Sequence, residues 1–223
     1  MAFKRYIPVE SISELTINRL SVYLRCLDRL EQEGVLTVSS QEMADRFHLN
    51  SAQIRKDLAY FGEFGIRGVG YNVAQLKEHL VNILGLNEQR HAVIVGAGNL
   101  GTALAHYSGF NTGGFRIVGI LDNDPKRIGA QIPGGLVVED VKFLPDIVKE
   151  RNVHIGVITV PATAAQKVFD ALVEAGVQAV LNFAPTQLKG HPEVKLKNVD
   201  LKINLELLSF FLTQAGRFIP ATA

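Results

Sequence analysis

The stretch His91-Ala-Val-Ile-Val-Gly-Ala-Gly-Asn-Leu-Gly101 decides the fold of the larger part of this chain. Its apolar residues are typical of a buried strand, and its glycines have the G-x-G-x-x-G spacing of a strand-to-helix turn. The first glycine permits the tight bend, the second lets the backbone approach a pyrophosphate, and the third lets the helix pack on the strand. The stretch therefore predicts a dinucleotide-binding turn made of Gly96, Ala97, Gly98, Asn99, Leu100 and Gly101.

A second apolar run, 116–121, ends at Asp122, about twenty residues after the turn. An acid at this place accepts hydrogen bonds from the adenosine ribose and repels a 2′-phosphate, which favours NAD(H) over NADP(H). Lys126 and Arg127 lie close enough to attract a phosphate, so the sequence leaves NADPH binding open. Asp122 is also an ordinary turn residue in Asp-Asn-Asp-Pro, and both interpretations can hold.

The rest of this half alternates strand and helix patterns, which predicts a Rossmann-like, doubly wound parallel sheet. Strands are expected at 92–95, 116–121, 155–160 and 179–183, with a helix over 164–174. Ligands of such sheets bind beyond the carboxyl ends of the strands. Two of those ends are expected to frame a nicotinamide, although their prolines are also ordinary strand terminators. The residues concerned are Val160, Pro161, Asn182, Phe183 and Ala184.

The first eighty residues predict short helices. Apolar residues recur at helical spacing over 17–30, and Gly34 ends the pattern. Ser39 and Glu42 form a capping box for a helix over 41–48, and Ser51 is expected to cap a helix over 52–61. Two short helices joined by a tight turn describe a helix-turn-helix, and a further helix is expected over 72–84.

The second helix of this pair is predicted to read DNA. Its apolar residues Ile54, Leu58 and Phe61 share one face, which leaves Gln53, Arg55, Lys56 and Ala59 toward solvent. Basic residues near the start of such a helix can reach major-groove edges, although a plain solvated face is the alternative. The glycine-punctuated segment 61–71 predicts a hairpin wing whose Arg67 can reach phosphate or the minor groove. The candidate DNA-binding residues are Ser51, Gln53, Arg55, Lys56, Tyr60 and Arg67.

Composition limits the remaining possibilities. The formal net charge of the 223 residues is +1, so DNA contact must come from a local basic cluster. The single cysteine, Cys26, excludes an internal disulfide. No apolar run is long enough for a membrane span, and the N-terminus lacks the apolar region of a signal peptide. The sequence therefore predicts a soluble, cytoplasmic protein without membrane contact.

Three segments together resemble one known family. They are the stretch from Ser51 to Tyr71, the turn Gly96-Ala-Gly-Asn-Leu-Gly101, and Leu181-Asn-Phe-Ala-Pro185. The first is highly specific, and the chain from about Arg19 to Phe210 resembles the Rex family of redox-sensing transcriptional repressors. The resemblance implies a homodimer that binds an inverted-repeat operator when NADH is scarce and releases it when NADH accumulates. It also implies that Tyr107, on the helix after the glycine turn, couples the nicotinamide to the DNA-binding domain with Arg25 and with Asp200 of the second subunit.

The C-terminal segment points to a dimer independently. Apolar residues wrap most of the helix expected over 201–212, and a helix that is apolar nearly all round must be buried nearly all round. Insertion into a partner subunit would bury it, and the resemblance implies the same swap.

The expected domains are a winged helix-turn-helix domain over 1–85, an NAD(H)-binding domain over 86–199 and a swapped dimerisation helix and tail over 200–223.

Two other classes of function compete with a repressor that binds NADH and NAD⁺. An NAD-dependent oxidoreductase would need catalytic groups, but the sequence has no Tyr-x-x-x-Lys pair and no Cys/His set with metal-ligand spacing. No catalytic residue and no metal ligand is therefore predicted. A module that binds coenzyme A or another nucleotide is the third possibility, because a glycine turn alone does not distinguish these ligands.

Overall fold

The computed structural model describes residues 12–111 and 113–214. The chain forms two compact units, Met1–Glu88 and Gln89–Ala223. The first unit is built around one hydrophobic cluster. The second has a cluster on each face of its sheet.

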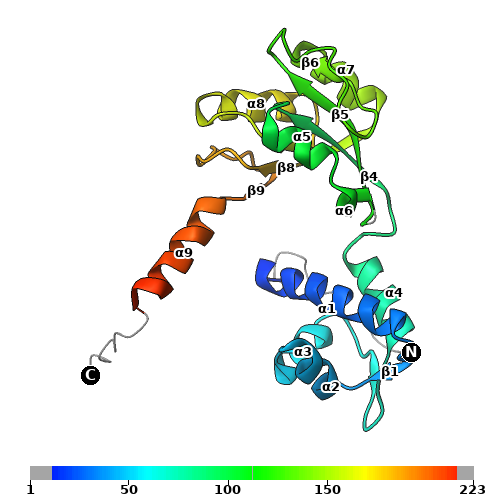
Figure 1. Ribbon diagram of the computed structural model, residues 1–223. Coiled ribbons are helices and arrows are strands. Elements are labelled where there is room, and N and C mark those ends of the chain that lie inside the picture. Colours follow the sequence, from blue (N-terminus) through cyan, green and yellow to red (C-terminus); the bar gives the residue numbers. More distant parts are fainter. Residues whose placement is uncertain (1–11, 112, 215–223) are drawn as a thin grey trace. The chain divides into compact units, whose positions relative to one another are not determined.

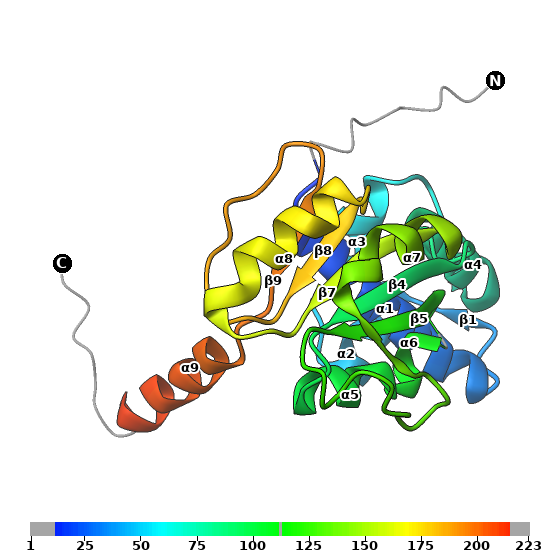
Figure 2. The same cartoon turned by 90° about the horizontal axis from the view of Figure 1, so that it is seen from above.

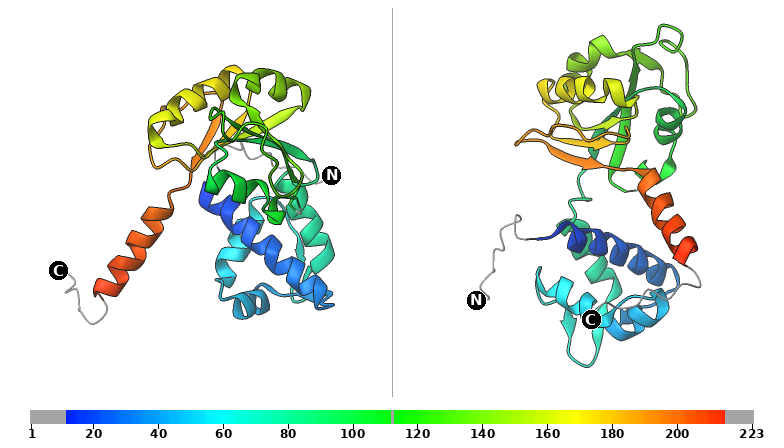
Figure 3. Two further views of the ribbon diagram at one scale, coloured as in Figure 1. Left: turned by 45° about the horizontal axis from the view of Figure 1, so that its top comes forward. Right: turned by 90° about the vertical axis from the view of Figure 1, so that its left-hand side faces the viewer.

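The first unit is a winged helix-turn-helix. Its helices are α1 (Glu14–Gln32), α2 (Ser40–Phe47), α3 (Ser51–Ala59) and α4 (Val73–Ile83). Three short strands, β1 (Thr37–Val38), β2 (Gly65–Ile66) and β3 (Gly70–Asn72), form an antiparallel sheet in the order β1-β3-β2. The β2–β3 hairpin projects beyond the helices of its unit (Figure 1 and Figure 3). The predicted helix pair and wing are thus confirmed.

The helix caps agree with the sequence in one case and correct it in the other. Ser39 caps α2 as predicted, since its hydroxyl accepts a hydrogen bond from the amide of Glu42 (3.0 Å). The cap of α3 is Asn50, whose side chain accepts from the amide of Gln53 (3.0 Å). Ser51 is the first residue of α3 and not its cap. Asparagine and serine are both favoured at an N-cap, so the local sequence did not separate two adjacent candidates.

The second unit contains a six-stranded parallel sheet in the order β6-β5-β4-β7-β8-β9. The strands are β4 (Arg90–Val95), β5 (Phe115–Asp122), β6 (Val138–Asp140), β7 (Val153–Ile158), β8 (Ala179–Asn182) and β9 (Lys195–Asn198). The helical elements are α5 (Asn99–Ala105), α6 (Ser108–Asn111), the 3₁₀ turn η2 (Val141–Phe143), α7 (Leu144–Glu150), α8 (Ala162–Glu174) and α9 (Leu201–Gln214). The predicted parallel sheet is confirmed, and the edge strands β6 and β9 were not predicted.

Helices cover both faces of this sheet. Val93 and Val95 of β4 pack with α7 and α8, whereas Ile94 packs on the other face, where α5 contributes Leu104. This alternation follows from the two-residue period of a strand. Figure 2 shows α8 and α7 on one side of the strands and α5 on the other. The carboxyl ends of β4, β5 and β7 meet at one edge, where the glycine turn lies.

Helix α9 is exposed in the single chain. Its eight large apolar side chains are each at least 50% exposed, although a helix with this composition is expected to be buried. Within the described residues of its own unit, this helix therefore finds no cover. The apolar side chains are Leu201, Ile203, Leu205, Leu207, Leu208, Phe210, Phe211 and Leu212. Among the described residues, no helix has the length and apolarity needed to cross a membrane.

Candidate functional site

The glycine turn has the geometry that its spacing predicts. Gly96 lies at φ +110°, and a Cβ there would stand 2.7 Å from the backbone oxygen of Thr159. A Cβ on Gly101 would overlap the carbonyl oxygen of Gly96. Gly98 is different, because the nearest atom to its Cβ position is Nη1 of Arg127 at 4.0 Å. The outer two glycines are thus required by packing, and the middle one leaves space for a ligand.

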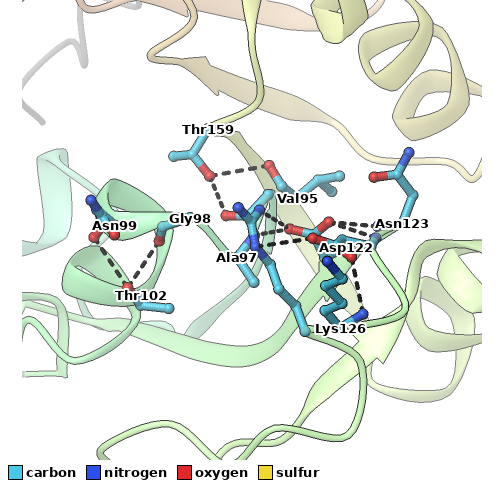
Figure 4. A network of polar contacts seen from close by, with 12 residues as sticks. Val95, Ala97, Gly98, Asn99, Thr102, Asp122, Asn123, Lys126 and Thr159 are labelled. Atoms are coloured by element: carbon cyan, nitrogen blue, oxygen red, sulfur yellow. Dashed lines mark hydrogen bonds and ion pairs between the residues drawn. The ribbon is translucent and has the colours of Figure 1, made fainter.

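Thr159, directly after β7, holds the turn in place. Its hydroxyl lies 2.8 Å from the carbonyl of Gly96 and 3.1 Å from that of Val95 (Figure 4). The hydroxyl of Thr102 bonds the carbonyls of Gly98 and Asn99 and fixes the first turn of α5 in the same way. The sequence placed Thr159 at a strand end expected near the nicotinamide, but it did not predict these bonds to the glycine turn.

Asp122 ends β5 and is buried, at 5% exposure. Its carboxylate accepts hydrogen bonds from the amides of Ala97 (2.7 Å), Asn123 (2.8 Å) and Asp124 (2.9 Å), and it pairs with Arg127 at 3.0 Å (Figure 4). Burial alone would raise the pKa of Asp122, but the bonds from Asp124, Ala97 and Arg127 outweigh it and lower the pKa. The carboxylate is therefore charged at neutral pH and joins the β5 tip to the glycine turn.

A cavity of about 850 Å³ opens at this edge of the sheet. It brings together predicted residues from four separate segments of the chain, including the turn, Asp122 and the ends of β7 and β8. It also includes residues outside the predicted binding set: apolar side chains of α7 and α8 line the interior, Lys167 supplies a charge, and Arg127, predicted only as a cation near a phosphate, lies at the wall. The predicted lining residues are Gly96, Gly98, Leu100, Asp122, Val160, Pro161 and Phe183, and the added ones include Arg127, Val141, Leu144, Thr159, Ala164, Lys167 and Val168.

The cavity fits a nucleotide by its chemistry. It has a backbone open to phosphate at Gly98, a buried carboxylate that accepts from hydroxyl groups, and an apolar interior for a base. No group of three or more His, Cys, Asp or Glu residues in the described part of the chain could hold a metal ion.

Asn182 and Ala184 lie at the end of β8 but hold their own loop. The buried amide of Asn182 donates to the carbonyl of Thr186 (3.1 Å) and to Oδ1 of Asn198 (2.9 Å), and its oxygen accepts from the amide of Ala184 (2.9 Å). These bonds tie β8 to the loop that follows it and to β9. The side chain of Asn182 therefore positions Phe183, which lines the cavity.

The three residues expected to couple the units lie on different elements. Tyr107 is not on α5, which ends at Ala105; it lies in the connection to α6, 57% exposed and edge-on to Phe110. Arg25 is exposed on α1. The carboxylate of Asp200 accepts from the amide of Lys202 (2.8 Å) and so caps the start of α9.

The candidate DNA-binding face is carried by α3 and the wing. Arg55, Lys56 and Tyr60 are exposed, and Nη1 of Arg55 donates to the hydroxyl of Ser40 on α2 at 2.8 Å. Arg67 is exposed on the wing between Ile66 and Val69, which are 70% and 59% exposed. These cations are available to a ligand from solvent.

Gln53 departs from the predicted solvent-facing set. Its side chain is half-buried and donates to the carboxylate of Asp57 at 2.7 Å. Asp57 is fully buried and also accepts from Arg19 (2.5 and 2.8 Å) and from the hydroxyl of Tyr23 (2.8 Å). This cluster, the Asp57 cluster, joins α3 to α1. Sequence reasoning missed it, because Arg19 and Tyr23 lie more than thirty residues away along the chain.

Comparison with known proteins adds to this geometry. Residues 11–59 match the family described as "Putative DNA-binding protein N-terminus", and residues 87–186 match the "CoA binding domain" family. The redox-sensing transcriptional repressor Rex of Pelotomaculum thermopropionicum is 53% identical over 91% of this chain and 95% of its own length.

Solved structures agree over both units. The chain is similar to RSP, a Rex-family repressor. The crystal structure of RSP in complex with β-NAD⁺ and operator DNA matches with a TM-score of 0.88 at 38% identity, covering 92% of this chain and 94% of that one. RSP in complex with β-NADH matches with a TM-score of 0.82 at 37% identity, covering 92% and 96%. With identity above one half over nine-tenths of its length, the chain belongs to the Rex family of redox-sensing transcriptional repressors.

Proposed function

We propose that this chain is a repressor that senses the ratio of NADH to NAD⁺, and that NADH binding to the second unit releases the first from an inverted-repeat operator. One observation carries the proposal: the cavity joins an open Gly98 to the buried carboxylate of Asp122, in a chain that also presents Arg55 and Lys56 on a helix-turn-helix. The relatives named repressors support it, as do the complexes of RSP with NAD⁺, NADH and operator DNA.

Discrimination between the two nucleotides must come from the nicotinamide ring. The glycine turn and Asp122 meet parts of the nucleotide that NAD⁺ and NADH share, and a ligand with equal affinity for two states shifts neither. The ring is cationic in NAD⁺ and neutral in NADH. Val160, Pro161 and Phe183 form an apolar edge of the cavity, which penalises an unpaired cation. This edge therefore favours NADH.

DNA recognition is assigned to α3 and the wing. Arg55 and Lys56 enter the major groove and Arg67 reaches phosphate or the minor groove. Ser51 and Tyr60 lie at the two ends of α3, where they meet the DNA backbone. Gln53 contributes by holding Asp57 rather than by a free amide.

The protein acts as a homodimer in this proposal. The exposed apolar side chains of α9 insert into the partner subunit, which buries a surface that the single chain leaves open. In this dimer, Asp200 of one subunit lies close to the other subunit, where it acts together with Tyr107 and Arg25. Two recognition helices at a fixed spacing match the two halves of an inverted repeat.

The test is a calorimetric titration of NADH with and without operator DNA. If NADH favours the DNA-free state by about 100-fold, the coupling is about 2.7 kcal/mol, and operator DNA must weaken NADH binding by the same factor. Coenzyme A in place of NADH is the control and is expected not to release DNA. If operator DNA leaves the NADH affinity unchanged, the proposed sensor function is wrong. If NADH is turned over with hydroxy acids or aldehydes, the protein is an enzyme instead.

A further inference from the structure

We propose that Arg127 determines which nucleotides this cavity accepts, because it exchanges the carboxylate of Asp122 for the diphosphate of a bound nucleotide. The inference rests on the proposed nucleotide site and deepens it. It assigns to the site a preference for nucleoside diphosphates over nucleosides, carried by one side chain that the glycine motif does not include.

Asp122 already accepts as many hydrogen bonds as a carboxylate can. A carboxylate has about four lone-pair directions, two on each oxygen. Oδ1 accepts from the amides of Asn123 and Asp124, and Oδ2 accepts from the amide of Ala97 and from Nη1 of Arg127. The acceptor capacity is therefore filled. A ribose hydroxyl that binds Asp122 must displace one of these four donors.

The four donors to Asp122 differ in how easily they can move. Three of the four are backbone amides, and moving them would unfold the glycine turn or the tip of β5. Arg127 bonds through a long side chain that is 48% exposed, and its other carboxylate contact, from Nε to Oδ2 of Asp124, is long at 3.7 Å. Displacing Arg127 from Asp122 therefore costs less free energy than displacing any of the three backbone amides.

A guanidinium displaced from Asp122 lies close to the place where a diphosphate binds. Nη1 of Arg127 is the nearest atom to the Cβ position of Gly98, at 4.0 Å, and Gly98 is the residue whose backbone a diphosphate approaches. Phosphate and guanidinium form short, often bidentate, charge-assisted bonds. A displaced Arg127 thus meets a phosphate without a large movement, and it offsets the repulsion between that phosphate and Asp122.

The experiment compares adenosine with ADP, which differ only in the diphosphate, and adds NADH, which carries the same diphosphate and the nicotinamide riboside. Calorimetry measures the affinity of the full-length chain and of Arg127→Ala for adenosine, ADP and NADH at low and high salt. Arg127→Ala is expected to weaken ADP and NADH by about tenfold and to flatten the salt dependence. Adenosine is expected to bind as well or better, because Asp122 no longer has to release a side chain. Lys126→Ala, which removes the same charge one residue away, is the matched control and should change each affinity less than twofold.

Two outcomes would overturn the inference. Unchanged ADP affinity in Arg127→Ala would show that the guanidinium does not reach the diphosphate. An equal loss for adenosine and ADP would show that Arg127 only holds Asp122 in place. Arg127→Lys, which keeps the charge, guards against a folding defect and should recover most of the ADP affinity.

The same titrations separate this inference from the proposed function. If the unaltered chain binds ADP but not NADH, the NADH sensor fails while Arg127 is still judged by ADP against adenosine. If the chain binds neither ADP nor NADH, both the sensor and the role of Arg127 are wrong.

Discussion

Replacing Asp57 with asparagine should destabilise the recognition helix although the change alters only one atom. Each carboxylate oxygen accepts two donors: Arg19 and Tyr23 on Oδ2, and Arg19 and Gln53 on Oδ1. An asparagine has one oxygen and one NH₂ group. In either orientation its NH₂ group faces two donors, so two hydrogen bonds are lost inside a fully buried site.

The magnitude follows from the exposure of the partners. A hydrogen bond to a charged group contributes about 1.5–3 kcal/mol, and a buried donor left unpaired costs about 1–3 kcal/mol. With the NH₂ group at the Oδ2 position the buried hydroxyl of Tyr23 loses its acceptor, and with it at the Oδ1 position the half-buried amide of Gln53 does. In both cases Arg19 has a 35% exposed side chain and regains part of its loss from water. We expect Asp57→Asn to lower the free energy of unfolding of the first unit by about 3 kcal/mol.

Native-state hydrogen exchange is the suitable assay because it resolves the two units. Amides of α1 and α3 that exchange through global opening of their unit should exchange about 100-fold faster, while those of β4 and β7 are the internal reference. Asp45→Asn is the matched control, since Asp45 accepts from Gln41 at an exposed site on α2 and should change stability by less than about 0.5 kcal/mol. Exchange in α1 and α3 that rises less than fivefold, or equally in both variants, would refute the reasoning.

The loss of stability caused by Asp57→Asn should also depend on pH. Burial alone would raise the pKa of Asp57, but the bonds from Arg19, Gln53 and Tyr23 outweigh it and lower the pKa. A carboxylate with a lowered folded pKa contributes stability that is fully present above its unfolded pKa, about 3.9, and is lost as the pH falls through the folded value. The difference between the unaltered chain and Asp57→Asn should therefore be constant near pH 7 and shrink below about pH 4.

Three further predictions concern the cavity, the DNA face and α9. Gly101→Ala should prevent stable folding of the second unit, because its Cβ overlaps the carbonyl of Gly96, whereas Gly98→Ala should fold with an unchanged circular dichroism melt but lose nucleotide affinity. Equal melting of both variants would contradict this. Arg55→Ala should weaken operator binding by about 1–3 kcal/mol in a mobility-shift titration, and Ser40→Ala, which removes only its partner on α2, should not. A chain ended at Asn198 should sediment as a monomer or precipitate and lose operator binding, and a soluble dimer that still binds operator would exclude a role for α9 in assembly.

The sequence by itself determined the elements whose signal is local. The glycine spacing 96–101 predicted a turn that the structure builds with Gly96 and Gly101 packed against Thr159. The apolar runs predicted four strands of the parallel sheet, and the pair of short helices with a wing predicted the first unit. These features depend on backbone geometry and on periods of two or 3.6 residues, which a single sequence displays directly.

The edge strands show where local signals end. β6 is Val138-Glu-Asp140 and β9 is Lys195-Leu-Lys-Asn198, and both are short and rich in charge. Their pairing is fixed by β5 and β8, the strands that precede them in the chain and lie beside them in the sheet. Neither segment carries a period long enough to predict a strand.

Only the tertiary structure decided the partners of the charged side chains. Asp57 and Gln53 lie on a helix whose pattern predicted a solvent-facing Gln53, yet Arg19 and Tyr23 of α1 turn this side of the helix into a buried polar site. Arg127 was predicted only as a cation near a phosphate, and its bond to a buried Asp122 was not. A charge can be buried only where several donors converge on it from separate segments of the chain, and that convergence is a property of packing that no local pattern records.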